Sequence, residues 1–174
     1  MLRFLSFIFV LLSLVFNPIK IEKKRILNPL DKIGIRDTLF IAMESTECGE
    51  WGGHKETILI FRKNEQKLNA RILIDTVPCN DIIEKNGVGI LNPEKRKIVI
   101  DKTILLKERD EKLFNNFIMN LKSLNLEESV IANFGEYFVV KNTNGALKFD
   151  FWNSMNSKNT NYNKLKKEIF GELK

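Results

Sequence analysis

The stretch KETILIFRKNEQKLNARILIDT, residues 55–76, decides the fold of this chain. Its first half alternates as a strand does, with Leu59 and Phe61 on one face and Ile58 and Ile60 on the other. Both faces are apolar, which is typical of a strand inside a sheet. The polar NEQK segment supplies a turn, and LNARILIDT returns as the second strand. The stretch therefore predicts a β-hairpin whose first strand has a neighbour on either side.

Further strands lie on both sides of this hairpin in the sequence. DTLFIAM, residues 37–43, precedes it, and KIVID, residues 97–101, follows it after turns at 86–89 (NGVG) and 92–95 (NPEK). EYFVVKNTNGALKFDFW, residues 136–152, predicts a second hairpin, because its Asn-Gly pair is a strong turn signal. The sequence thus predicts about five to six strands, paired mainly through hairpins.

Two segments have the apolar spacing of amphipathic helices. The first covers residues 106–124 and repeats apolar residues at helical intervals: Leu113, Phe114, Phe117, Ile118, Leu121 and Leu124. The second closes the chain and aligns Tyr162, Leu165, Ile169 and Leu173 in one stripe. We expect the apolar face of the first helix, including Leu113, Phe117, Ile118 and Leu121, to be buried against the sheet.

Strands combined with two segregated helices predict an α+β fold. We expect an antiparallel sheet of about five to six strands with one long and one C-terminal helix packed on it. Residues 37–174 form a single globular domain in this prediction, because the chain has the usual length of one domain. Residues 20–36, which contain Pro29 and several charges, are predicted to be a linker.

The N-terminus carries an apolar run from Phe4 to Phe16 that only two serines interrupt. This length suits the apolar region of a signal peptide better than a membrane-spanning helix, which needs about 20 residues. A buried core helix is the alternative. No small-residue cleavage pattern follows the run, so residues 1–19 are predicted to be either a signal peptide or a short membrane anchor. We expect an exported or envelope protein that contacts the membrane only through residues 1–19.

The formal net charge of +6 favours an acidic partner only weakly, because the basic residues are spread out and mixed with acidic ones. No arginine-rich face with interleaved aromatic residues is present, so we expect no nucleic-acid partner. The sequence also lacks a phosphate-binding loop and a dinucleotide fingerprint, and we expect no cofactor.

The segment STECGEWGGHKETILIFR, residues 45–62, contains one of the two cysteines and the single histidine. Cys48 follows the first predicted strand, and Cys79 follows the third. If these strands run in the same direction, the two cysteines meet at one end of the sheet. Two cysteines in an exported protein usually pair, so we predict a Cys48–Cys79 disulfide. Trp51 and His54 mark the connecting segment as a candidate binding loop, in which Trp51 either is an exposed anchor or folds back over the core.

Three alternatives for the cysteines remain open at this point. Two separate buried thiols are expected if the protein is cytosolic. A zinc site would take Cys48, His54, Cys79 and a carboxylate such as Glu50 or Glu56, but the spacing matches no zinc signature, so we predict no metal. A thiol enzyme would use a free cysteine with His54 as its base, but no known local signature surrounds either cysteine, and we predict no catalytic residue.

The blocks ESTECGEWGGHKETILIFR and NYNKLKKEIFGEL resemble a group of uncharacterised exported bacterial proteins. The resemblance covers two short blocks. It implies export and a shared fold and transfers no catalytic residue. Relative to that group, this chain lacks a second cysteine pair near its C-terminal hairpin.

Two functions stay open from the sequence. The first is a non-enzymatic, exported or envelope-tethered module that binds another envelope protein, which the small size and the lack of a catalytic constellation favour. The second is a small hydrolase or thiol enzyme that uses the loop between Cys48 and His54. The redox state of the cysteines separates them, because a stable disulfide removes the nucleophile.

Overall fold

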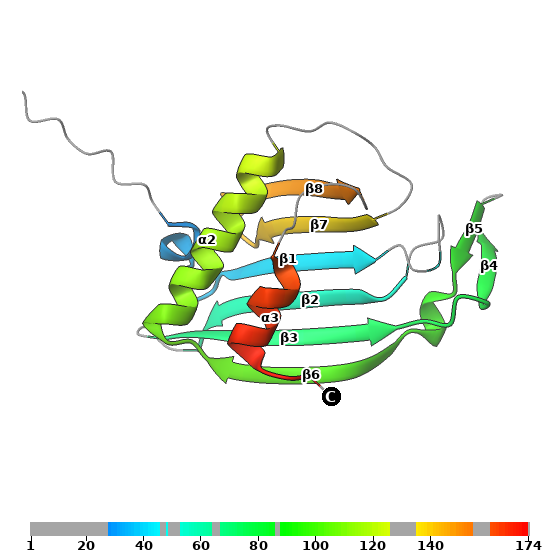
Figure 1. Ribbon diagram of the computed structural model, residues 1–174, viewed down its shortest axis with the longest axis horizontal. Helices are drawn as coiled ribbons and strands as arrows, with labels where there is room; N and C mark the ends of the chain where they lie inside the picture. The colour runs from blue at the N-terminus through cyan, green and yellow to red at the C-terminus, as the bar shows by residue number, and fades with distance from the viewer. Residues whose placement is uncertain are drawn as a thin grey trace, which may run out of the picture.

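A computed structural model describes residues 28–45, 48, 53–63, 67–85, 88–125, 135–154 and 161–173. In this part of the chain the strands are β1 (Thr38–Ser45), β2 (Lys55–Arg62), β3 (Leu68–Thr76), β4 (Ile82–Lys85), β5 (Val88–Leu91), β6 (Lys97–Leu105), β7 (Gly135–Asn142) and β8 (Lys148–Ser154). The helices are α2 (Glu108–Asn125) and α3 (Tyr162–Phe170), with short 3-10 turns η1 (Pro29–Lys32) and η3 (Pro93–Lys95) (Figure 1).

Six strands form one sheet in the order β6-β3-β2-β1-β7-β8, and every neighbouring pair is antiparallel. The predicted hairpin is confirmed as β2 and β3, with Ile58 opposite Ile72 and Ile60 opposite Ala70. The inner position of β2 is also confirmed, because β1 pairs with its other edge. The second predicted hairpin is confirmed as β7 and β8.

Both helices cross the same face of this sheet (Figure 1). The core lies between the two helices and the sheet. From the strands it includes Ile41, Ile58, Ile72 and Val140, all fully buried. From α2 it receives Phe114, Phe117, Ile118, Leu121 and Leu124, and from α3 Tyr162, Leu165, Ile169 and Phe170. Leu113 is only partly buried. The predicted α+β class, with one long and one C-terminal helix on an antiparallel sheet, is confirmed.

Strands β4 and β5 form a separate two-stranded sheet, which lies beyond the end of the main sheet (Figure 1). The sequence predicted only a turn at residues 86–89, and this was wrong in part, because Val88 and Gly89 belong to β5. Both strands are four residues long and β4 is exposed throughout, so they show no buried alternation that would identify them. Strand β6 also continues to Leu105, four residues beyond the predicted segment.

The segment before β1 packs against the domain. Leu30 and Ile33, in the range predicted as a linker, are 1% and 4% exposed. The backbone N–H of Leu30 donates to the side-chain carbonyl of Asn115 on α2, at 3.0 Å. Leu30 and Ile33 therefore belong to the core cluster. Residues 1–19 lie outside the described residues.

None of the helices in the described ranges combines the length and the apolar character that crossing a membrane requires.

Candidate functional site

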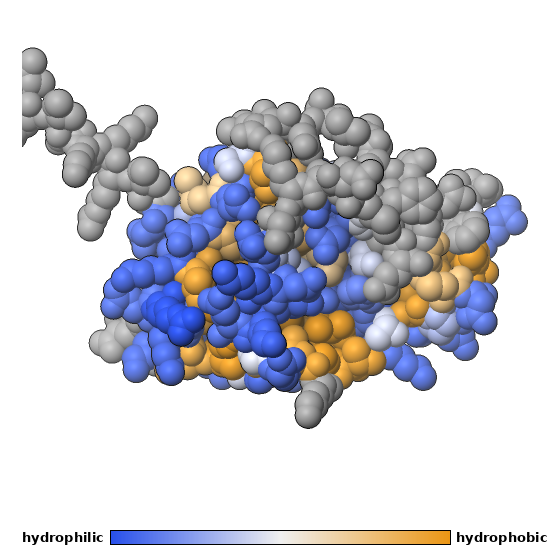
Figure 2. Space-filling view, in the orientation of Figure 1, coloured by the Kyte–Doolittle hydropathy of each residue, from blue (hydrophilic) through white to orange (hydrophobic). Residues whose placement is uncertain are grey.

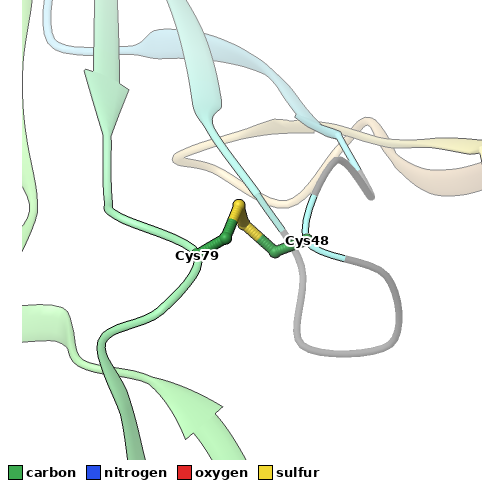
Figure 3. The surroundings of a disulfide bond; sticks show 2 residues. All are labelled: Cys48 and Cys79. Atoms are coloured by element: carbon green, nitrogen blue, oxygen red, sulfur yellow. A yellow bond between two sulfur atoms is a disulfide. The ribbon is translucent and has the colours of Figure 1, made fainter.

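Cys48 and Cys79 form a disulfide, as the sequence predicted, with their Cα atoms 5.2 Å apart (Figure 3). Strands β1 and β3 both pair antiparallel with β2, so they run in the same direction and end at the same edge of the sheet. Each cysteine follows one of these ends. The disulfide therefore ties the segment after β1 to the segment that leads from β3 into β4.

The disulfide belongs to a small apolar cluster at this end of the sheet. This cluster is separate from the main core and consists of Cys48, Val77 and Leu91. Val77 and Leu91 are 7% and 6% exposed. The clustered side chains anchor the hairpin of β4 and β5, whose apolar residues gather at one end of the molecule (Figure 2). Ile82 and Ile83 on β4 remain 39% and 36% exposed. A bulky apolar surface at the end of the hairpin can contribute to contacts with another protein.

His54 lies in a polar cluster beneath α3. Its Nε2 atom is 3.3 Å from Oε1 of Glu56, and Nζ of Lys166 approaches the same oxygen at 2.6 Å. The Glu56 side chain is only 5% exposed, and that of Lys166 is 15% exposed. A carboxylate buried to this extent needs a cationic partner to remain charged. Lys166 supplies this charge, and the ion pair fastens α3 to β2.

Tyr162 completes this cluster and is fully buried. Its ring lies 5.0 Å from Nζ of Lys166. Burial raises the pKa of the Tyr162 hydroxyl well above its ordinary value, and the negative charges of Glu56 and Glu136 raise this pKa further. Tyr162 therefore stays protonated at physiological pH, and the cluster is a structural anchor for the start of α3.

The raised pKa of Tyr162 predicts a loss of stability in alkali. Above pH 10.0, the ordinary pKa of tyrosine, the unfolded chain releases this proton while the folded chain retains it. The free energy of unfolding should therefore fall as the pH rises, by up to about 1.4 kcal/mol per pH unit from this group. Urea denaturation at several pH values above 10 measures the slope. The variant Tyr162→Phe serves as the control and should lose less stability per pH unit; equal slopes in both proteins would contradict the assignment.

The two alternatives left open for Cys48, a thiol enzyme and a zinc site, find little support in this arrangement. Both sulfur atoms are in the disulfide, so neither is a free thiolate in this form. His54 contacts a carboxylate and lies in the cluster with Lys166. Within the described ranges, no group of three or more histidine, cysteine, aspartate or glutamate side chains can hold a metal ion. Trp51 and Glu50 lie outside the described residues.

The second face of the six-stranded sheet is crossed by no described helix, since α2 and α3 lie together on the first (Figure 1). Side chains alternate across a strand, so the neighbours of the buried residues point to this second face. We call it the open face. Its apolar side chains are partly exposed and lie outside the core cluster: Phe40, Leu59, Phe61, Leu73, Val139 and Trp152.

The strand register places these side chains together. Phe40 lies opposite Leu59, and Ala42 lies opposite both Thr57 and Val139. Farther out, Trp152 lies opposite Tyr137, with their ring centroids 4.9 Å apart. Aromatic side chains that are partly exposed beside aliphatic ones are characteristic of protein-binding surfaces. The open face is therefore a candidate protein-binding surface.

Some of the charged side chains on the open face have a partner on the same face. Arg71 forms an ion pair with Asp101 at 2.6 Å, and this contact raises the pKa of Arg71 and lowers that of Asp101. The hydroxyl of Tyr137 donates to Asp150 at 3.0 Å, and the pKa of Tyr137 is raised, first by burial and then by this hydrogen bond. Lys141 and Lys148, on the neighbouring strands β7 and β8, make no ion pair with a described residue.

Sequence reasoning placed the disulfide correctly but did not find the open face. The signal was present in the alternation of Thr57, Leu59 and Phe61, which indicated an inner strand with two apolar faces. Comparison with protein-family models, curated proteins and solved structures gives no match.

Proposed function

We propose that this chain is a non-enzymatic protein-binding module that is exported or tethered to the cell envelope. The observation that supports it is the open face, where aromatic and aliphatic side chains from five neighbouring strands remain partly exposed. A six-stranded sheet normally buries such side chains against a second layer. A partner protein supplies that layer in this proposal.

Two observations support placement outside the cytoplasm. The disulfide between Cys48 and Cys79 is stable in oxidising compartments and rare where thiols are kept reduced. The apolar run from Phe4 to Phe16 suits an export signal or a short anchor. The resemblance to exported bacterial proteins agrees with this placement, and export itself stays a prediction.

The alternative function, a hydrolase or thiol enzyme at the Cys48–His54 loop, has weaker support. A nucleophilic cysteine must be a thiolate, and Cys48 is bonded to Cys79. His54 contacts Glu56, which Lys166 already neutralises. These contacts favour a structural role for the histidine.

Site-specific photo-crosslinking in the source cells tests the proposed function. A benzoylphenylalanine residue replaces Thr57, which is partly exposed and lies opposite Ala42 and Leu73 in the middle of the open face. The matched control replaces Met119, which is 41% exposed on α2. We expect a cross-linked protein partner from position 57, in the envelope or exported fraction, and at least about tenfold less product from position 119, because cross-linking requires direct contact.

Two results would contradict this proposal. Equal cross-linking from positions 57 and 119 would show that the open face has no special role in binding. Recovery of the full-length chain in the cytoplasmic fraction alone would exclude export and tethering.

A further inference from the structure

The open face contains a pair of like charges in direct register. Lys141 on β7 lies opposite Lys148 on β8, and both side chains are exposed. Like charges that face each other across two strands destabilise the sheet. An anion bound between the two lysines would relieve this repulsion.

No described carboxylate forms an ion pair with this lysine pair. Asp150 lies two residues beyond Lys148 on the same face, where this carboxylate accepts a hydrogen bond from the hydroxyl of Tyr137. Asp101 forms an ion pair with Arg71 near the opposite edge of the sheet, on strands β6 and β3. Neither lysine forms an ion pair with any residue in the described ranges. The lysine pair is therefore a positive patch without a direct ion-pair partner among the described residues.

Apolar side chains border this positive patch on one side. Nζ of Lys141 lies 5.9 Å from the centre of the Phe40 ring, and Phe40 lies opposite Leu59 on the next strand. Val139 is two residues from Lys141 on the same face. A ligand over this region can place a carboxylate between the two lysines and an apolar side chain on Phe40 and Leu59.

We propose that the open face binds an acidic segment of a partner protein, in which aspartate or glutamate stands next to aromatic or aliphatic residues. This inference rests on the proposed function and names the class of partner. Charge complementarity selects the acidic side chains, and the apolar area supplies affinity. A second copy of the chain is a poorer match as the occupant, because Arg71 already neutralises Asp101 on its open face and the same two lysines add positive charge to that face.

Selection from a random peptide library tests the proposal. The probe is a displayed library of twelve-residue peptides, about the length that spans such a face, and the target is the full chain in mild detergent with its disulfide intact. We expect the selected peptides to be enriched in Asp and Glu beside Phe, Tyr, Leu or Ile. We also expect their affinity to fall as the salt concentration rises, because exposed charges are screened.

Charge reversal tests the role of the two lysines without disturbing the fold. Lys141→Glu turns the like-charged pair into an opposite-charged pair with Lys148, which should support the sheet. Loss of binding in this variant therefore cannot be attributed to unfolding. We expect the dissociation constant of an acidic peptide to rise about tenfold, and more in the double variant Lys141→Glu/Lys148→Glu. The matched control is Lys164→Glu on α3, with the same change in net charge, and it should bind normally.

The double variant should also reverse the charge preference for peptides, because it keeps the two side chains opposite each other and makes both of them negative. Selection against it should yield peptides rich in Lys and Arg. Selected peptides without an acidic preference, or unaffected by both lysine variants, would overturn the inference and leave the proposed function intact. A chain dimer that Lys141→Glu dissociates would overturn the inference in favour of a second copy. No selected binder at all would contradict both the inference and the proposed function.

Discussion

Replacement of Phe117 by Ala should lower the free energy of unfolding by about 3–5 kcal/mol. Phe117 is 5% exposed and lies where three elements meet. Its ring centroid is 6.2 Å from that of Phe138 on β7 and 5.8 Å from that of Tyr162 on α3. Truncation therefore removes apolar burial and two ring contacts and leaves a cavity between α2, the sheet and α3.

Urea denaturation followed by circular dichroism measures this loss. The slope of the unfolding free energy against urea concentration should stay unchanged. Met119→Ala is the matched control on the same helix, because Met119 is 41% exposed and its truncation should change stability by about 0.5 kcal/mol or less. A loss below about 1 kcal/mol for Phe117→Ala would place this side of α2 outside the core.

The elements with strong periodicity could be predicted from the sequence. The hairpin of β2 and β3 and the helix α2 each show an apolar repeat that matches one kind of structure, and local pattern was sufficient. The hairpin of β4 and β5 has no such repeat, because Ile82 and Ile83 are both exposed. Its position depends on the disulfide and on the cluster with Val77 and Leu91, which are tertiary features.

The candidate site was predictable to a smaller extent. The two cysteines could be paired, because a three-strand meander places Cys48 and Cys79 at one edge. The ion pair of Glu56 with Lys166 joins residues 110 positions apart, and no local pattern reports such a contact. The open face could not be assigned either. Alternation shows that β2 has two apolar faces, but the chain connections decide which of them the helices cover.

The variant Cys48→Ser/Cys79→Ser should lose about 3–4 kcal/mol of stability, from the chain-entropy estimate for a loop of 31 residues. Without the disulfide the unfolded chain gains conformations that the folded chain cannot use. Urea denaturation of the oxidised protein and the double variant measures the difference. The internal control is a reductant, which should destabilise the native chain by a similar amount and leave the double variant unchanged. A loss under about 1 kcal/mol would show that the disulfide constrains the unfolded state only slightly.

This loss should be uneven across the molecule. The disulfide holds the connection into β4, where Cys48 packs with Val77 and Leu91, whereas the core under α2 and α3 is a separate cluster. Amide hydrogen exchange should therefore accelerate most in β4 and β5, through local opening, and in β2 and β3 only as far as global stability falls. If the open face is the binding surface, the double variant should still bind acidic peptides at low temperature, because Phe40 lies near the start of β1, away from the end that the disulfide joins, and Lys141 lies opposite Phe40 on β7. Loss of that binding in the folded double variant would place the partner on the disulfide-linked hairpin and not on the open face.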